Sequence, residues 1–191
     1  GELSERAGLA TGVVTTARLT HATPAAVYAH AANRDWERDT SLPEEAVRNG
    51  CKDIARQLIE FPFGDGLDVA MGGGRTNFLP VEASDPEQAE QKGERRDARN
   101  LAEEWKAKSG DHLYVSDRGG FDAIDASSAP KVLGLFESSH MEYEADRASD
   151  TGGEPSLAEM AAKAIEILRQ DKDGFFLMVE GGRIDHAHHV G

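Results

Sequence analysis

The sequence is poor in features that would place it in several common protein classes. Cys51 is its only cysteine, which excludes an internal disulfide and a four-cysteine zinc site. Its strongest apolar run, Phe175 to Val179, is far shorter than the roughly 20 residues that a membrane-spanning helix needs. The first residues also lack the apolar stretch of a signal peptide. A mature chain and an excised segment of a longer one are both compatible with this pattern.

Positive charge is also scarce. There are 21 Lys and Arg residues against 35 Asp and Glu residues, which gives a formal net charge of -14. Such a surface repels the phosphates of nucleic acids and anionic membranes, so we predict no nucleic-acid partner. A small phosphorylated substrate stays open, because nearby metal ions and arginines outweigh a distant net charge. With 191 residues, 39% of them hydrophobic, the chain can form one domain or part of a larger one.

Short apolar runs alternate with longer amphipathic ones along the chain. This alternation indicates βαβ units and predicts an α/β fold with a mainly parallel sheet. The predicted strands cover residues 13–19, 67–71, 112–115, 132–136 and 175–179. The last of them is apolar throughout, so we expect it to be buried on both faces. Polar excursions at about 79–96 and 138–154 interrupt what we interpret as a single partial domain over 1–191.

Capping signals mark where helices begin. Thr23-Pro24 predicts a helix with a threonine N-cap and proline in its first turn. Ser41 to Glu44 has capping-box spacing, and apolar residues then recur at helical period as far as Leu58, despite Gly50. The same Ser-x-x-Glu spacing begins an amphipathic helix over residues 156–168.

The densest group of chemistry-bearing residues follows the last predicted strand, from Glu180 to His189. In open α/β sheets ligands gather at the carboxyl ends of strands, where Glu180 stands. If Asp185 begins a helix, His189 is four residues on and rotated by only about 40°, so carboxylate and imidazole share a face. That pair suits zinc, whereas Glu180 suits a hard ion such as magnesium. Two ligands do not complete a zinc site, and a solvated, histidine-rich helix start is the competing interpretation.

A second group follows the first predicted strand and should reach the same edge of a parallel sheet. In His21-Ala22-Thr23-Pro24, the threonine is more often an N-cap than a metal ligand. Arg34 could clamp a phosphate through its planar fork of donors, or it could be a surface arginine paired with Asp35. Spacing alone favours the simpler interpretation in both cases.

Six segments taken together match the pattern of one known family. They are Val13 to Thr16, His21 to Ala26, Asn33 to Trp36, Gly72 to Arg75, Leu133 to Glu137 and Val179 to His189. Their order and spacing resemble the alkaline phosphatase family over essentially the whole chain. The most specific parts are Val179 to His186 and His21 to Pro24, whereas the triple glycine alone would be weak. With His21 and His186, the sequence resembles the animal-like branch of the family, because the enterobacterial branch has Asp and Lys at these two positions.

The resemblance implies an α/β/α sandwich that hydrolyses phosphate monoesters through a phosphoserine intermediate, with two zinc ions and one magnesium ion. By the same resemblance, Asp185 and His189 would bind the zinc that activates water, and Thr23 and Glu180 would bind magnesium. Arg34 would grip two phosphate oxygens.

The resemblance also implies roles for two histidines, the kinds of partner and the location of the protein. His21 and His186 would tune the magnesium site and the phosphate. The partners would be small phosphomonoester substrates and a second copy in a homodimer, and the location would be extracellular, periplasmic or at the cell surface.

The animal-like branch also implies a calcium site. Its ligands match Glu87, the backbone carbonyl of Phe136, Glu137 and Glu154. Glu154 stands where the family more often has Asp, and the loop before it differs in sequence.

Some parts of the family pattern do not occur in these 191 residues. There is no Asp-Ser-Ala motif for the nucleophile, neither Ser127 nor Ser138 lies in a matching context, and the remaining zinc ligands of the family fall beyond Gly191. We therefore interpret the chain as an internal fragment that is inactive by itself. A non-catalytic metal-binding or structural segment is the alternative from another class, and a related sulfatase or phosphoglycerate mutase is the alternative within the superfamily.

Overall fold

The computed structural model describes residues 1–190, and its sheet has five strands that all pair in parallel. The strands are β1 (Ala10–Arg18), β2 (Val69–Gly73), β3 (His112–Val115), β4 (Lys131–Leu135) and β5 (Phe175–Glu180). In space they follow the order β3-β4-β2-β1-β5. The α/β fold with a mainly parallel sheet is therefore confirmed, and each predicted strand overlaps an observed one.

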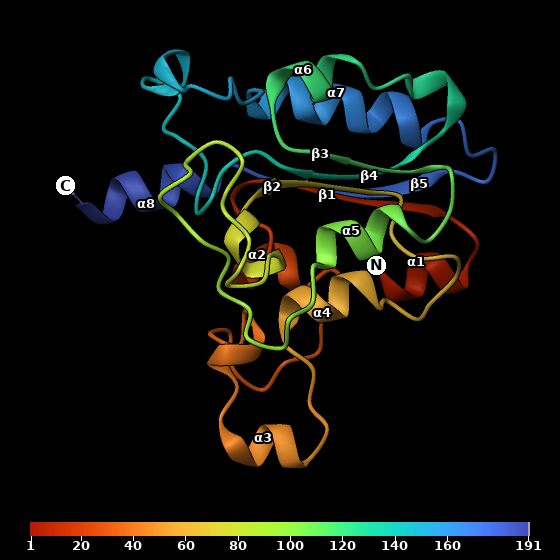
Figure 1. The fold of residues 1–191 in the computed structure, drawn as a ribbon. Helices are drawn as coiled ribbons and strands as arrows, with labels where there is room; N and C mark the ends of the chain where they lie inside the picture. Colours follow the sequence, from red (N-terminus) through yellow and green to blue (C-terminus); the bar gives the residue numbers. More distant parts are fainter. Residues whose placement is uncertain (191) are drawn as a thin grey trace.

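Helices lie on both faces of this sheet (Figure 1). They are α1 (Glu2–Arg6), α2 (Ala22–Ala25), α3 (Glu44–Arg48), α4 (Ile54–Ile59), α5 (Leu101–Lys106), α6 (Arg118–Asp122), α7 (Leu157–Leu168) and α8 (Gly182–Val190). In Figure 1, α6 and α7 cover one face, α1, α2, α4 and α5 cover the other, and α3 stands away from the sheet. Within residues 1–190, no helix is long and apolar enough to cross a membrane.

The alternating direction of strand side chains creates a hydrophobic core on each face. On β1, Val13 joins the core that contains Leu58 of α4, whereas Val14 joins the core that contains Met160 of α7. Both valines have 0% exposure. Because β1 is buried on both sides, its carboxyl end, which carries part of the candidate site, is held by the packing of both cores.

The helix predicted from the Ser41 capping box through Leu58 is divided in the structure. The chain forms α3 and then α4, with Gly50 between them at a φ of 75°, a conformation that an α-helix cannot contain. Asp53 caps α4 by accepting the Arg56 N–H through its side chain at 2.9 Å. The prediction failed because a left-handed glycine and a second cap outweighed the apolar period.

Of two other predicted helix starts, one is confirmed and one is wrong. The capping box of Ser156 and Glu159 forms as predicted at the start of α7, with both reciprocal hydrogen bonds present. In α2, however, the N-cap position is occupied by His21 and not by Thr23, which lies inside the helix. The threonine N-cap was therefore a wrong prediction, and the Thr23 side chain is left exposed.

The expectation that the last strand is buried on both faces is wrong for the described residues. β5 pairs with β1 along one side and forms the edge of the sheet. Phe175, Phe176 and Val179 keep exposures of 39%, 39% and 45%. The apolar composition of this strand thus reflects a surface that residues 1–190 do not cover.

Candidate functional site

The residues of the two predicted groups reach one edge of the sheet. β1 and β5 are parallel neighbours, with Thr15 opposite Glu180, so the segments after both strands emerge on the same side. The Thr15 hydroxyl donates to Glu180 Oε2 at 2.6 Å and fixes that carboxylate. α2, which carries Thr23, contacts both strands. The positions of Thr23 and Glu180 at one edge agree with the expectation from parallel strands.

The spacing of Asp185 and His189 produces the expected shared face of α8. His189 Nε2 lies 3.4 Å from Asp185 Oδ1, and the two side chains are 79% and 70% exposed. The start of the helix is anchored because the Arg183 N–H donates to Thr16 Oγ1 at 3.0 Å. A carboxylate and an imidazole at this distance can approach one metal ion together.

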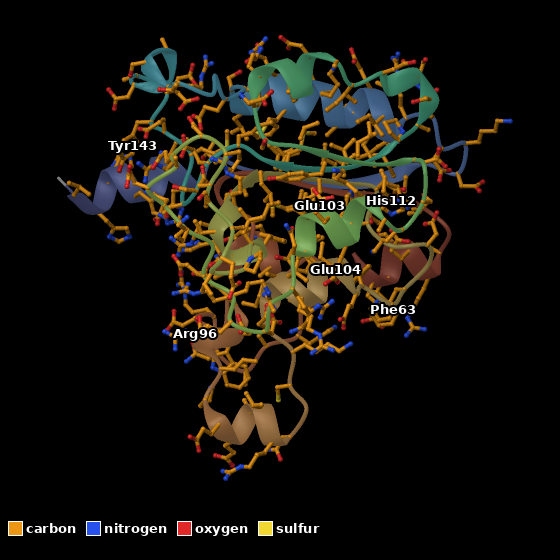
Figure 2. All side chains as sticks on the ribbon, viewed as in Figure 1. Phe63, Arg96, Glu103, Glu104, His112 and Tyr143 are labelled. Atoms are coloured by element: carbon orange, nitrogen blue, oxygen red, sulfur yellow. The ribbon has the colours of Figure 1, made fainter. Side chains whose placement is uncertain are left out.

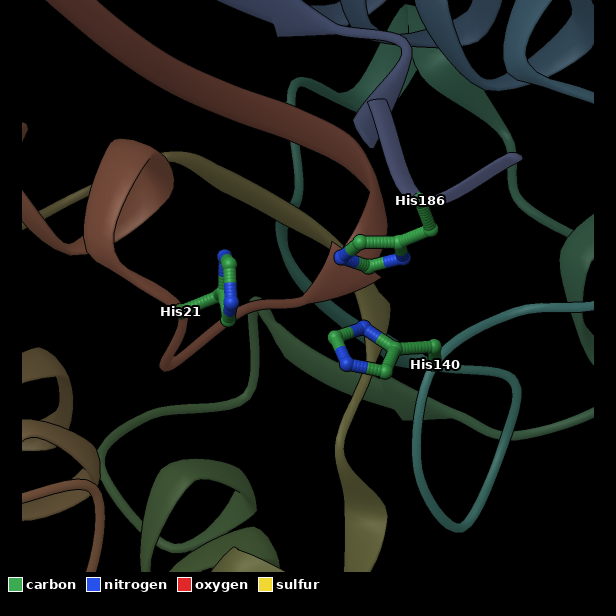
Figure 3. A group of neighbouring side chains, drawn as sticks. All are labelled: His21, His140 and His186. Carbon is green, nitrogen blue, oxygen red and sulfur yellow. The ribbon is translucent and has the colours of Figure 1, made fainter. Parts of the chain in front are cut away.

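Three imidazoles meet beside this helix, and we call His21, His140 and His186 the histidine triangle (Figure 3). Each offers a ring nitrogen, and these nitrogens lie within 4.8 Å of one another. The ring centroids are 5.3 Å apart for His21 and His140, 4.3 Å for His140 and His186, and 5.6 Å for His21 and His186. His21 and His186 were predicted from the sequence, whereas His140 was not.

Arginine side chains surround the histidine triangle. Arg34 Nη2 lies 3.0 Å from His21 Nε2, and Arg183 Nη1 lies 3.3 Å from His186 Nδ1. Burial and then the Arg18 charge lower the pKa of His21, and the same two causes lower that of His140 to about 3. The imidazoles of His21 and His140 are therefore neutral at neutral pH, and the positive charge of this region comes from guanidinium groups.

The surroundings of Arg34 bear on its two interpretations, a phosphate clamp or a surface arginine paired with Asp35. Within residues 1–190, Arg34 forms no ion pair with Asp35, and its guanidinium contacts His21 instead. Arg34 is exposed and lies in a turn after α2. Because a guanidinium has donors in a planar fork, an arginine without a carboxylate partner at this edge can accept two oxygens of an anion.

A second cluster lies after β4, and we call Glu87, Glu137 and Asp150 the acidic cluster. One carboxylate oxygen from each lies within 4.8 Å of the others. Burial, followed by the charges of Glu87 and Asp150, raises the pKa of Glu137 to about 8. Arg75 reaches this cluster through a 3.0 Å contact with Glu87. The carboxylates of the acidic cluster still repel one another, and a hard divalent cation bound by their oxygen atoms would relieve this repulsion.

Glu154, predicted with Glu87 and Glu137, lies beside the acidic cluster. Its carboxylate accepts the Glu142 N–H at 3.1 and 3.2 Å, and its own N–H donates to Asp150 Oδ2 at 2.8 Å. Burial raises the pKa of Glu154 to about 8. Asp150 was missed because an aspartate in a polar loop carries no spacing signal. The Phe136 carbonyl belongs to the residue directly before Glu137, at the end of β4.

Comparisons with known proteins agree with the residue pattern. A family profile described as "Alkaline phosphatase" matches residues 2–191. The chain is 47% identical to the tissue-nonspecific isozyme of alkaline phosphatase from Gallus gallus, over 96% of this chain and 36% of that protein. It is 44% identical to a "Membrane-bound alkaline phosphatase" of Bombyx mori, over 93% of this chain and 32% of that protein.

Solved structures give the same result. The Thermus thermophilus alkaline phosphatase matches with a TM-score of 0.74 and 32% identity, over 99% of this chain and 33% of that one. A His 135 Asp mutant of TAB5 alkaline phosphatase, described with Mg bound in its M3 site, matches with a TM-score of 0.63 and 27% identity, over 99% of this chain and 43% of that one. The chain thus spans a third to under a half of the length of these proteins.

Proposed function

Because the chain belongs to the alkaline phosphatase family, we propose that it supplies part of the metal and phosphate site of a phosphate monoester hydrolase. The observation that carries this proposal is the meeting of His21, Arg34 and His186 at the sheet edge where Glu180 ends β5. The substrates we propose are small phosphomonoesters. The family is metal-dependent, and the choice of zinc, magnesium and calcium for this chain is part of the proposal.

Four residues at this edge fit the metals. Asp185 and His189 would hold zinc, since their donor atoms share one helical face at 3.4 Å. Glu180 and Thr23 would hold magnesium with oxygen donors, and the Thr15 hydroxyl orients the Glu180 carboxylate for that role. When bound, these ions supply charge stabilisation for the transferring phosphoryl group and lower the pKa of water.

The organic side chains of the site bind and orient the substrate. The fork of donors on Arg34 would hold two phosphate oxygens, and His21 keeps the guanidinium in place by accepting from Nη2. His186 packs edge-on against His21 and accepts from Arg183. Neutral imidazoles at these positions leave the positive charge to the arginine that contacts phosphate.

The nucleophile of the proposed phosphoserine mechanism lies outside the 191 residues. Ser127 donates its hydroxyl to Asp125 at 2.7 Å in an exposed turn, and Ser138 is 4% exposed in the segment after β4, where its carbonyl accepts from the Thr76 N–H. Within residues 1–190, neither side chain hydrogen-bonds a member of the histidine triangle. We therefore propose that a longer polypeptide completes the site, and that this polypeptide forms a homodimer at the cell surface or outside the cell, as the resemblance implies.

The isolated 191 residues should hydrolyse p-nitrophenyl phosphate at a rate indistinguishable from buffer. The nucleophile and part of the zinc ligand set are missing, so bound metal cannot lead to phosphoryl transfer. Steady-state assays of the purified chain with added zinc and magnesium test this expectation. Zinc-dependent turnover that co-purifies with the chain would contradict it, whereas turnover by a whole-length polypeptide carrying these residues would support the proposed hydrolase over a non-catalytic segment.

We also propose that the acidic cluster binds calcium and stabilises the folded protein. Without a cation, the raised pKa of Glu137 means that the folded state keeps a proton above pH 4.5 that the unfolded chain has lost. Stability should therefore fall as pH rises from 4.5 to about 8, and calcium should raise the melting temperature most at the upper end of this range. Thermal melts of the whole-length polypeptide measure this.

Variants in the acidic cluster separate calcium binding from a general effect of salt. Glu137→Gln should abolish the rise in melting temperature caused by calcium and leave the affinity for zinc nearly unchanged. Asp150→Asn and Glu154→Gln then identify which acid completes the site, since the structure puts Asp150 in the cluster and Glu154 beside it. An equal calcium shift in wild type and Glu137→Gln would show that the assignment to Glu137 is wrong.

A further inference from the structure

His140 is held in place by the segment that follows β4. Its neighbours on both sides bond to the ends of other strands: the Gly74 N–H donates to the Ser139 carbonyl at 2.6 Å, and the Met141 N–H donates to the Thr16 carbonyl at 3.1 Å. These bonds connect the segment to the ends of β2 and β1. The His140 backbone therefore has little freedom relative to the sheet.

Arg18 orients the imidazole of His140. The Arg18 N–H at the end of β1 lies 3.1 Å from Nδ1, and Arg18 Nη1 lies 2.7 Å from Nε2. A neutral imidazole accepts at one ring nitrogen, so Arg18 holds the ring through one hydrogen bond and one contact. Glu37 holds that guanidinium in turn at 2.7 and 2.8 Å. With this orientation, the ring meets His21 at 76° and His186 at 67°, both edge-on (Figure 3).

His140 can influence Arg34, the proposed phosphate-binding residue, through His21. Among residues 1–190, His21 is the side chain that hydrogen-bonds the Arg34 guanidinium, which otherwise lies on an exposed turn. A shift of the His21 ring would therefore release Arg34. We propose that His140 is a positioning residue that, by packing against His21, keeps Arg34 oriented for phosphate; this inference rests on the proposed function.

The surroundings of the histidine triangle favour positioning over direct metal binding. A metal-bound imidazole usually donates its second N–H to a carboxylate, a carbonyl or water. Here each imidazole instead has a ring nitrogen against an arginine donor, from Arg18, Arg34 or Arg183. Three nearby guanidinium groups would also repel a cation placed among the rings.

Two substitutions separate the ring of His140 from its hydrogen bond. His140→Asn keeps an oxygen that can accept the Arg18 N–H but removes the aromatic edge next to His21. His140→Phe keeps the edge and removes the acceptor. If the ring positions His21, the Asn variant should raise the inhibition constant of inorganic phosphate and the KM roughly tenfold, as for loss of one hydrogen bond to a charged group, with a smaller change in kcat. The Phe variant should recover most of this loss.

The experiment uses the whole-length phosphatase that carries these residues, with p-nitrophenyl phosphate as substrate and inorganic phosphate as inhibitor. His112→Asn is the matched control: it removes a half-buried imidazole packed edge-on against Trp105, in a part of the molecule far from Tyr143 and α8 (Figure 2). A double-mutant cycle with Arg34→Ala provides the second readout, because His140→Asn should then have no further effect on phosphate inhibition.

Each outcome bears on a different claim. An unchanged phosphate inhibition constant in His140→Asn, an equal change in His112→Asn, or full additivity with Arg34→Ala would each overturn the positioning role. A wild-type polypeptide with no turnover would instead overturn the proposed hydrolase. A melting temperature lowered without any change in phosphate inhibition would assign His140 to stability alone.

Discussion

Asp185→Ala in a whole-length phosphatase that carries these residues should lower kcat/KM for p-nitrophenyl phosphate by at least about 100-fold. Asp185 shares its helical face with His189, 3.4 Å away, and loss of the carboxylate leaves the imidazole without the partner that we propose for zinc. Bound zinc, measured by elemental analysis, should fall together with the rate. The side chain is exposed, so the fold should not be affected.

A matched control for this variant is Asp173→Ala. Asp173 is also exposed, but it precedes β5 and therefore lies at the opposite end of the strand from the candidate site. It should retain wild-type zinc content and rate. Full zinc content and full activity in Asp185→Ala would show that the α8 face is a solvated helix start, the competing interpretation of the histidine-rich segment.

Arg75→Met should destabilise the protein by about 3–5 kcal/mol at neutral pH, the cost expected when one partner of a buried ion pair is removed. Arg75 and Asp85 are both 0% exposed and form two bonds at 2.6 and 2.7 Å. Methionine fills much of the volume but leaves the Asp85 charge in the interior and removes the cation next to Glu87. Urea unfolding of wild type and variant measures the difference.

The pH dependence gives a further test of the same pair. Burial would raise the pKa of Asp85, but the hydrogen bonds from Arg75 outweigh it and hold that pKa below 3.8. A lowered carboxyl pKa stabilises the fold above pH 3.8, and this contribution is lost as pH falls through the folded-state value. The difference in the free energy of unfolding between wild type and Arg75→Met should become smaller as the pH is lowered. Arg75→Met/Asp85→Leu should recover part of the loss, and a gap independent of pH would exclude this explanation.

Features encoded by neighbouring residues could be predicted from the sequence. The capping box of Ser156 and Glu159 begins α7 as expected, and the i, i+4 spacing of Asp185 and His189 gives a shared face. Both depend on interactions within one turn of helix. Gly50 shows the limit, because its left-handed backbone ended a helix that apolar periodicity had extended through it.

Residues that act through tertiary contacts could not be predicted in the same way. His140 meets Arg18 across 122 positions, and only the parallel order β4-β2-β1 brings their segments together. Asp150 reaches Glu87 and Glu137 because a polar loop folds back over the end of β4. Neither residue lies in a motif with recognisable spacing, so the strand order had to be known first.

The open side of β5 has a consequence for the behaviour of the isolated segment. An edge strand presents unpaired main-chain N–H and C=O groups, and Phe175, Phe176 and Val179 add apolar surface to it. A groove beside it is lined by Leu157 of α7 and Ile184 of α8, among others. In the longer polypeptide that we propose, a further strand could pair along this edge, whereas the isolated residues 1–190 leave it open to pairing with another chain. We therefore expect the isolated segment to aggregate at high concentration.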